Sequence, residues 1–112
     1  MQAALADEIT SLIERARAGT LAVEDVTGAV FTVMSLGGSP IDGFRRLLHQ
    51  PQASILGIGR GRPRPAVVDD RIEPRITLAL SLTVDHRVTD GMPSAAFLAD
   101  VAELLGQPAD PA

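Results

Sequence analysis

Strict two-residue alternation marks the stretch from Ile76 to Val84. Apolar side chains take every second position, and small or hydroxyl-bearing side chains take most of the positions between them. The apolar set is Ile76, Leu78, Leu80, Leu82 and Val84. This pattern predicts a half-buried strand, and its last apolar residue comes directly before Asp85 and His86. His86 should therefore stand at the end of a rigid strand, a position that suits catalysis.

Apolar residues recur at helical spacing near both ends of the chain. The first set, Leu5, Ile9, Leu12, Ile13 and Ala16, predicts an amphipathic helix of about four turns. Gly19 should end this helix. The second set, Phe97, Leu98, Val101, Leu104 and Leu105, predicts a helix between Gly91 and Gly106. Pro93 suits its first turn, because a helix leaves the first N–H groups without partners.

The residues between the helices predict short strands. A run rich in β-branched residues at 30–36 should be the first strand, and a short apolar run at 54–59 an interior strand. Residues 44–48 are expected to form a helical turn. We expect residues 54–59, 66–68 and 76–84 to form a meander of three strands.

The order of these elements predicts an α+β fold. It should be a two-layer sandwich of a mostly antiparallel sheet with both helices on one face, in a single domain over residues 1–112. Two helices leave the other face and at least one sheet edge without cover. We therefore expect self-association or a missing neighbour.

Composition narrows the function further. The net charge of −4 disfavours binding to nucleic acid or to an anionic membrane surface. The absence of cysteine excludes a disulfide framework, a thiolate nucleophile and a cysteine metal site. No apolar run approaches the roughly 20 residues that span a bilayer, so we expect a cytoplasmic protein.

His86 is the main candidate for chemistry, because an imidazole titrates near neutral pH and can serve as a general base. A lone histidine at a strand end can equally be structural. Asp90 either caps the last helix or organises a site. Asp85 and Arg87 either tie down the loop by local hydrogen bonds or, in the case of Arg87, contact a substrate.

Basic residues outside this run are further candidates for ligand binding. The arginines at 60, 62 and 64 could bind phosphates, although a solvated hairpin loop also accounts for them. His49 is expected to be a surface residue. We predict no metal site, because no second histidine or carboxylate stands at ligand spacing.

The run Asp85-His86-Arg87-Val88-Thr89-Asp90-Gly91 resembles the D-H-R-x-x-D-G signature of the dihydrolipoyl acyltransferases, the core components of 2-oxo acid dehydrogenase complexes. Residues 28–37 are similar to that family's G-G-T-F-T-I-S-N-L-G, and the likeness extends from about Leu5 to Leu105. The resemblance implies the chloramphenicol acetyltransferase-like fold at about half its length. It covers the C-terminal half of the family's catalytic domain.

The resemblance also implies roles for individual residues. His86 would be the base that takes the proton from the thiol of coenzyme A or of dihydrolipoyl, and Asp90 would organise the site. Coenzyme A or a lipoyl thioester would be a substrate, and no tightly bound cofactor is implied. The family's sites lie between subunits of a trimer, so we expect a homotrimer, a larger homo-oligomer, or an assembly with a chain that supplies the missing half.

One position departs from the family. A serine hydroxyl there stabilises the oxyanion, and the ungapped register places Met34 at that position. Losing one such donor costs on the order of 100- to 1,000-fold in rate. Ser35 is adjacent, but a one-residue shift points it to the opposite face unless the strand has a bulge. Met34, Ser35 and Arg87 are the candidate substrate contacts.

Three functions remain open. The leading one is an acyltransferase that uses His86 and moves an acyl group between a thioester carrier and a thiol or hydroxyl. The second is a catalytically inactive structural or partner-binding subunit derived from the same family. The third is a specialised acyltransferase of secondary metabolism that uses an acyl carrier protein.

Overall fold

The computed structural model describes residues 1–107, which form two compact units. The first unit covers residues 1–29 and holds helix α1 (Gln2–Ala18) and a short 3-10 helix, η1 (Val23–Val26). Gly19 ends α1 in a left-handed conformation with φ of 72°, which confirms the predicted helix end. An ion pair between Arg15 and Asp25 links η1 to α1.

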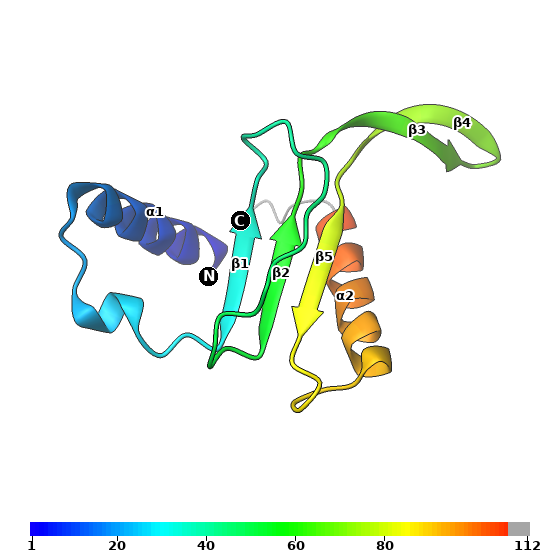
Figure 1. The fold of residues 1–112 in the computed structure, drawn as a ribbon. Helices are drawn as coiled ribbons and strands as arrows, with labels where there is room; N and C mark the ends of the chain where they lie inside the picture. Colours follow the sequence, from blue (N-terminus) through cyan, green and yellow to red (C-terminus); the bar gives the residue numbers. More distant parts are fainter. Residues whose placement is uncertain (108–112) are drawn as a thin grey trace. The chain divides into compact units, whose positions relative to one another are not determined.

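The second unit begins at Val30 and is built on a three-stranded sheet (Figure 1). Its strands are β1 (Phe31–Ser35), β2 (Ser54–Ile58) and β5 (Leu80–Val84). Strand β2 lies in the middle, parallel to β1 and antiparallel to β5. The sheet is therefore mixed, and both β1 and β5 are edge strands within this unit.

The predicted meander is wrong in its pairing. Strand β2 pairs with β1 and β5, while β3 (Arg62–Val68) and β4 (Arg71–Thr77) form a separate antiparallel hairpin. The expected strand 76–84 is thus two strands, interrupted at residues 78–79. Proline explains the separation, because it donates no hydrogen bond and is confined to edge strands. Three prolines lie in β3 and β4.

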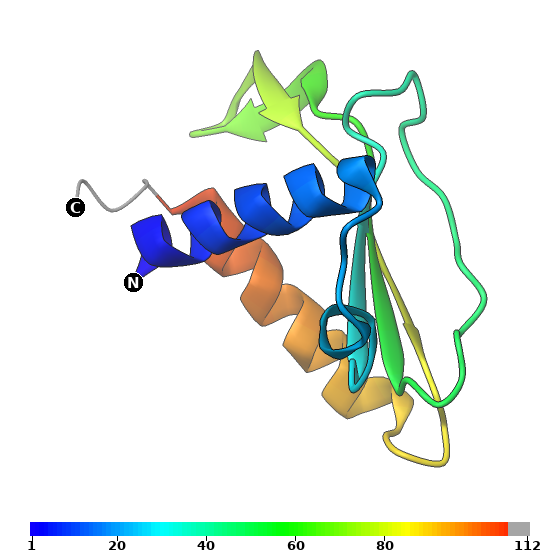
Figure 2. The ribbon, with the colours of Figure 1, turned by 90° about the vertical axis from the view of Figure 1, so that its left-hand side faces the viewer.

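Helix α2 (Gly91–Gly106) and the segment 37–50 cover opposite faces of the three-stranded sheet (Figure 2). The ring of Phe97 on α2 meets that of Phe31 on β1 edge to face, with centroids 5.9 Å apart. Ile55 and Leu56 on β2 are the buried apolar residues, at 3% and 6% exposure. The α+β class and the last helix are confirmed, and α2 packs against β5.

The expected helical turn at 44–48 is also wrong. This segment is extended, and the backbone carbonyls of Phe44 and Arg46 accept hydrogen bonds from Ser81 and Thr83 on β5 at 2.7 and 2.9 Å. These two carbonyls are thus paired with side-chain hydroxyls of the sheet and not with N–H groups of a helix. Neither helix within residues 1–107 is long and apolar enough to cross a membrane, and no cluster of metal-ligating side chains occurs there.

Candidate active site

His86 lies in a tight turn that follows β5 directly. The N–H of Asp85 donates to the carbonyl of Ala53 at 2.9 Å, which continues the pairing of β5 with β2 for one residue beyond the strand. The N–H groups of Val88 and Thr89 then donate back to the carbonyl of Asp85 at 2.9 and 3.1 Å. The sheet therefore fixes the start of the turn, and the turn leaves His86 exposed.

Asp85 and Arg87 form an ion pair on either side of His86 in the sequence. Arg87 Nε donates to Asp85 Oδ1 at 3.0 Å, and Arg87 Nη2 donates to Oδ2 at 2.7 Å. These side-chain bonds, with the backbone N–H of Arg87 on Oδ1, lower the pKa of Asp85 to about 2. The carboxylate therefore stays ionised at neutral pH. The local hydrogen bonds expected of this pair are present.

Asp90 occupies the N-cap position of α2 without capping it through its side chain. Its backbone carbonyl accepts bonds from the N–H and the hydroxyl of Ser94 at 3.2 and 2.7 Å. Among the described residues its carboxylate enters no hydrogen bond or ion pair. That leaves an exposed, uncommitted carboxylate four residues after His86.

Met34 and Ser35 lie on opposite faces of β1. The register from Phe31 to Ser35 is regular and contains no bulge, so Ser35 cannot take the place of the residue before it. Met34 is aligned with Gly57 and, through it, with Ser81, on the face that the segment 37–50 covers. The hydroxyl of Ser35 accepts a bond from the N–H of Gly37 at 3.3 Å.

The structure does not bring Met34 and His86 together within one chain. Met34 lies two strands away from Ser81, and His86 lies five residues beyond Ser81, in the turn after β5. With about 3.3 Å per residue and about 4.8 Å between strands, the two Cα atoms are roughly 19 Å apart. A site that uses both positions therefore does not form within a single chain.

The hollow beside the turn offers no alternative site. It lies between the sheet and the start of α2, and it is lined by Phe31, Ser54, Leu82, Val84, Thr89, Pro93, Ser94 and Phe97. None of these side chains titrates near neutral pH, and His86 is not among them. The hollow belongs to the contact between α2 and the sheet.

The arginines at 60, 62 and 64 converge on the carboxylate of Asp42, a residue that no sequence pattern had indicated. Arg62 donates to both its oxygens at 3.0 and 2.8 Å, and the other two arginines lie 3.1 and 3.2 Å from Oδ1. The bonds from Arg62 contribute most to lowering the pKa of Asp42 to about 2. No signal marked Asp42, because a lone aspartate in a loop is ordinary.

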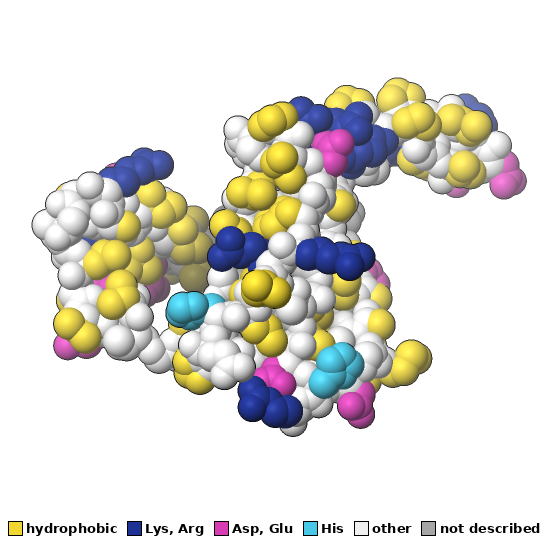
Figure 3. Space-filling view, viewed as in Figure 1, with side chains coloured by type: hydrophobic (Ala, Val, Ile, Leu, Met, Phe, Trp, Pro, Cys, Tyr) yellow, Lys and Arg dark blue, Asp and Glu magenta, His cyan; other side chains and the backbone are white. Residues whose placement is uncertain are grey.

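The face that carries the segment 37–50 also carries both histidines and much of the positive charge (Figure 3). Arginine side chains, shown in dark blue, recur over this face. The exposed position of His49 agrees with the expected surface role.

Comparison with known proteins identifies the family. The model of the 2-oxoacid dehydrogenases acyltransferase (catalytic domain) matches residues 2–111. The chain belongs to this acyltransferase family. It is 37% identical over 105 residues to the dihydrolipoyllysine-residue acetyltransferase component of the acetoin cleaving system of Bacillus subtilis (strain 168). That alignment covers 94% of this chain and 26% of the relative.

Solved acyltransferase structures share the fold. One is dihydrolipoamide acetyltransferase of Azotobacter vinelandii, in which a serine, a histidine and an asparagine were investigated for their role in catalysis. It matches with a TM-score of 0.84 and 38% identity, over 92% of this chain and 42% of that one. The cubic core of the pyruvate dehydrogenase multienzyme complex gives 0.85 and 36%, with the same coverage.

The chain spans about a quarter of the length of the curated relatives and about two fifths of the solved chains. The share of the solved chains is consistent with the expectation that this chain covers about half of the family's catalytic domain.

Proposed function

We propose that this chain supplies the histidine side of an acyl-transfer site, with His86 as general base and Asp90 as organiser. One observation carries the proposal: an exposed His86 is held at the end of β5 by the sheet and by the Asp85–Arg87 pair. An imidazole so placed is accessible to an incoming thiol. It is also fixed in position, as a catalytic base must be.

The spacing of residues in the Azotobacter protein supports the same assignment. There the serine precedes the histidine by 52 residues, and the asparagine follows it by four. The same intervals counted from His86 lead to Met34 and Asp90. The histidine therefore has a match, while methionine and aspartate replace the other two residues.

The proposed reaction transfers an acyl group between sulfur atoms. His86 takes the proton from the thiol of coenzyme A or of a dihydrolipoyl group, and the thiolate attacks the carbonyl carbon of the acyl thioester. A tetrahedral oxyanion forms and then collapses, which breaks the bond to the first sulfur. That leaving thiolate recovers the proton from the imidazolium.

A second chain is part of this proposal. Because Met34 and His86 are roughly 19 Å apart in one chain, the oxyanion position facing His86 must come from elsewhere. A homotrimer or larger homo-oligomer would supply it, as would a chain that carries the missing half of the domain. The solved cubic core supports an assembly of this general kind.

The test is an acyl-transfer assay with acetyl-coenzyme A and dihydrolipoamide, on the full chain with and without a candidate partner chain. His86→Ala should remove turnover, while His49→Ala, the matched control at the other exposed histidine, should leave it unchanged. Turnover that survives His86→Ala would eliminate this mechanism. The same assay is also run with an acyl carrier protein as the acyl-carrying substrate.

The second candidate is a catalytically inactive subunit that keeps the family's fold for assembly. The observation that favours it is Met34, because a thioether sulfur cannot donate a hydrogen bond to an oxyanion. Ser35 points to the opposite face and cannot compensate. This candidate predicts a stable assembly that shows no turnover with any of the substrates above.

A further inference from the structure

Few hydrogen bonds hold the middle of the segment 37–50, residues 40–48, against the sheet. One is a backbone bond, from the N–H of Arg60 to the carbonyl of Ile41 at 2.8 Å. Two others are the hydroxyl bonds from β5 described above. The remaining polar attachment among the described residues is the carboxylate of Asp42. The position of this segment thus depends on side chains, because no strand ladder fixes its backbone.

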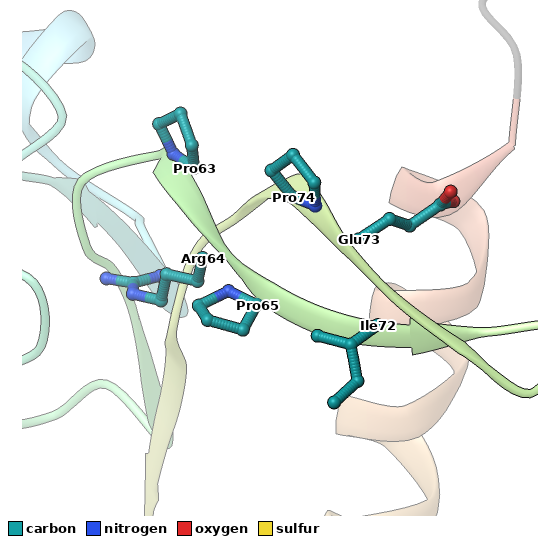
Figure 4. A pocket seen from close by; sticks show the side chains of 6 residues that line it. All are labelled: Pro63, Arg64, Pro65, Ile72, Glu73 and Pro74. Atoms are coloured by element: carbon teal, nitrogen blue, oxygen red, sulfur yellow. The ribbon is translucent and has the colours of Figure 1, made fainter.

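Asp42 connects this segment to the base of the β3–β4 hairpin. Its three arginine partners belong to the link after β2 and to β3 itself. One of them, Arg64, also donates to the carbonyl and to the hydroxyl of Thr77 on β4, at 2.7 and 2.9 Å. In the close view the Arg64 side chain points away from the tip of the hairpin and toward the three-stranded sheet (Figure 4). The carboxylate of Asp42 is thus bound to a support that both hairpin strands hold.

The charges of this cluster make the carboxylate indispensable to it. Three guanidinium groups face one carboxylate, so two positive charges are in excess among the described residues. Like charges at such short range repel each other, and Asp42 offsets that repulsion. A neutral amide at position 42 would leave the three cations without this counter-ion, and they would move apart. The segment would then lose the one side chain that ties it to the arginines.

Phe44, two residues after Asp42, reaches the strand that pairs with β1. A Cβ built on Gly57 would lie 3.1 and 3.3 Å from two atoms of the Phe44 ring, Cζ and Cε2. The ring therefore lies over Gly57, which is the register partner of Met34. Asp42 and Phe44 are both half-buried, while the residues beside them in the segment are exposed. The two side chains thus point inward together, like alternate residues of a strand.

We propose that Asp42 is a positioning residue of the acyl-transfer site, which acts through Phe44 on the position that Met34 occupies. The inference rests on the proposed function, in which this position faces the oxyanion. The arginines hold Asp42, the extended backbone from Asp42 holds Phe44, and the Phe44 ring covers Gly57 beside Met34. A shift of the segment would admit water beside Met34, and a developing charge is stabilised less in a site open to water.

The first experiment follows the Phe44 ring directly. The chain contains three phenylalanines, so fluorine NMR of the chain labelled with fluorophenylalanine gives three signals, and Phe44→Leu assigns one of them. Phe31 and Phe97 meet each other on the opposite face of the sheet and are internal controls. Asp42→Asn should shift the Phe44 signal toward its value in urea-unfolded protein and leave the other two in place. Glu73→Gln, at an exposed arginine pair on β4, is the matched control and should move none of the three.

The acyl-transfer assay measures the consequence for the reaction. It is run on the wild type and on Met34→Ser, each with and without Asp42→Asn. Asp42→Asn should lower kcat about tenfold or more and change KM less, because a displaced group loses its effect in the transition state. A merely structural role would leave the kcat of the folded fraction unchanged, and the two control signals report that fraction. Arg62→Gln, which keeps two arginines on Asp42, should cause smaller changes in the same direction.

The outcomes separate this proposal from the proposed function. A Phe44 signal that stays in place in Asp42→Asn overturns the positioning role, and so does an equal shift of all three signals. A shifted signal with an unchanged kcat overturns the effect on catalysis. If neither the wild type nor Met34→Ser shows turnover, the proposed function is rejected together with that effect. The fluorine signals then decide alone whether Asp42 holds the segment.

Discussion

The guanidinium of Arg87 forms a two-pronged ion pair with the carboxylate of Asp85, and His86 lies between them in sequence. The two shortest bonds of the fork are 2.7 Å, from Nη2 to Oδ2, and 3.0 Å, from Nε to Oδ1. Arg87 is largely exposed, so the pair contributes little to global stability. Its main effect is to fix the turn that carries the proposed base.

Arg87→Lys should therefore lower kcat by roughly tenfold to a hundredfold, because small misplacements of a catalytic group are costly and lysine cannot form the fork. The KM should change less, since Arg87 is committed to Asp85. Steady-state kinetics measure both constants. Arg45→Lys, at an exposed arginine in the segment 37–50, is the control. An unchanged kcat in Arg87→Lys would show that the Asp85–Arg87 pair does not position His86.

Acid should destabilise the fold between about pH 4 and pH 2. The pKa of Asp42, which has three arginine partners, falls from 3.8 to about 2 on folding. The stabilisation from this group is complete above the unfolded pKa and disappears as the pH falls through the folded pKa. Thermal melts across this range should show the decline, and Asp42→Asn should flatten it. A melting temperature that is constant down to pH 2 would contradict the ion pairs.

Glycine is required at position 59 by a close backbone approach. A Cβ there would lie 1.8 Å from the carbonyl oxygen of Asp42, whereas at Gly43 the nearest atom would be 3.7 Å away. Gly59→Ala should lower the free energy of unfolding by about 3 kcal/mol or more, and Gly43→Ala by less than about 0.5 kcal/mol. Urea unfolding measures both. Equal effects would show that the segment near Asp42 does not lie as described.

The substitution Asp90→Ala tests whether Asp90 caps helix α2 or belongs to the acyl-transfer site. Because the Asp90 carboxylate makes no capping bond, the free energy of unfolding should change by less than about 1 kcal/mol, the effect of the helix dipole alone. Turnover should fall at least tenfold if Asp90 organises the site. Urea unfolding and the acyl-transfer assay measure the two effects. The reverse result, lost stability with full turnover, would identify Asp90 as a structural cap.

The helices and the site motif could be predicted from the sequence because their signals are local. Gly19 ends α1 through its own backbone conformation, and the run from Asp85 to Gly91 is contiguous. Strand pairing could not be predicted in this way. The alternation through Ile76 to Val84 is continuous, yet the chain changes partner at residues 78–79. The prolines at 63, 65 and 74 were the available evidence for that change.

Asp42 escaped prediction for a different reason. Its three arginine partners are 18 to 22 positions away in sequence, and only the path of the segment 37–50 across the sheet brings them together. That path depends on hydroxyl donors of β5, which hold the backbone at Phe44 and Arg46. No single-residue pattern encodes such a contact.

Met34→Ser decides between the two candidate functions. Restoring a hydroxyl at this half-buried position in β1 supplies a donor for the oxyanion, and such a donor accounts for about 100-fold or more in rate. We therefore expect turnover to rise by about that factor in the assembled protein. The double variant Met34→Ser with His86→Ala should show no rise, because the base is then missing. Met92→Ser, at a methionine that is 82% exposed, controls for the substitution itself. If Met34→Ser and the wild type are equally inactive in an intact assembly, the chain is a structural subunit.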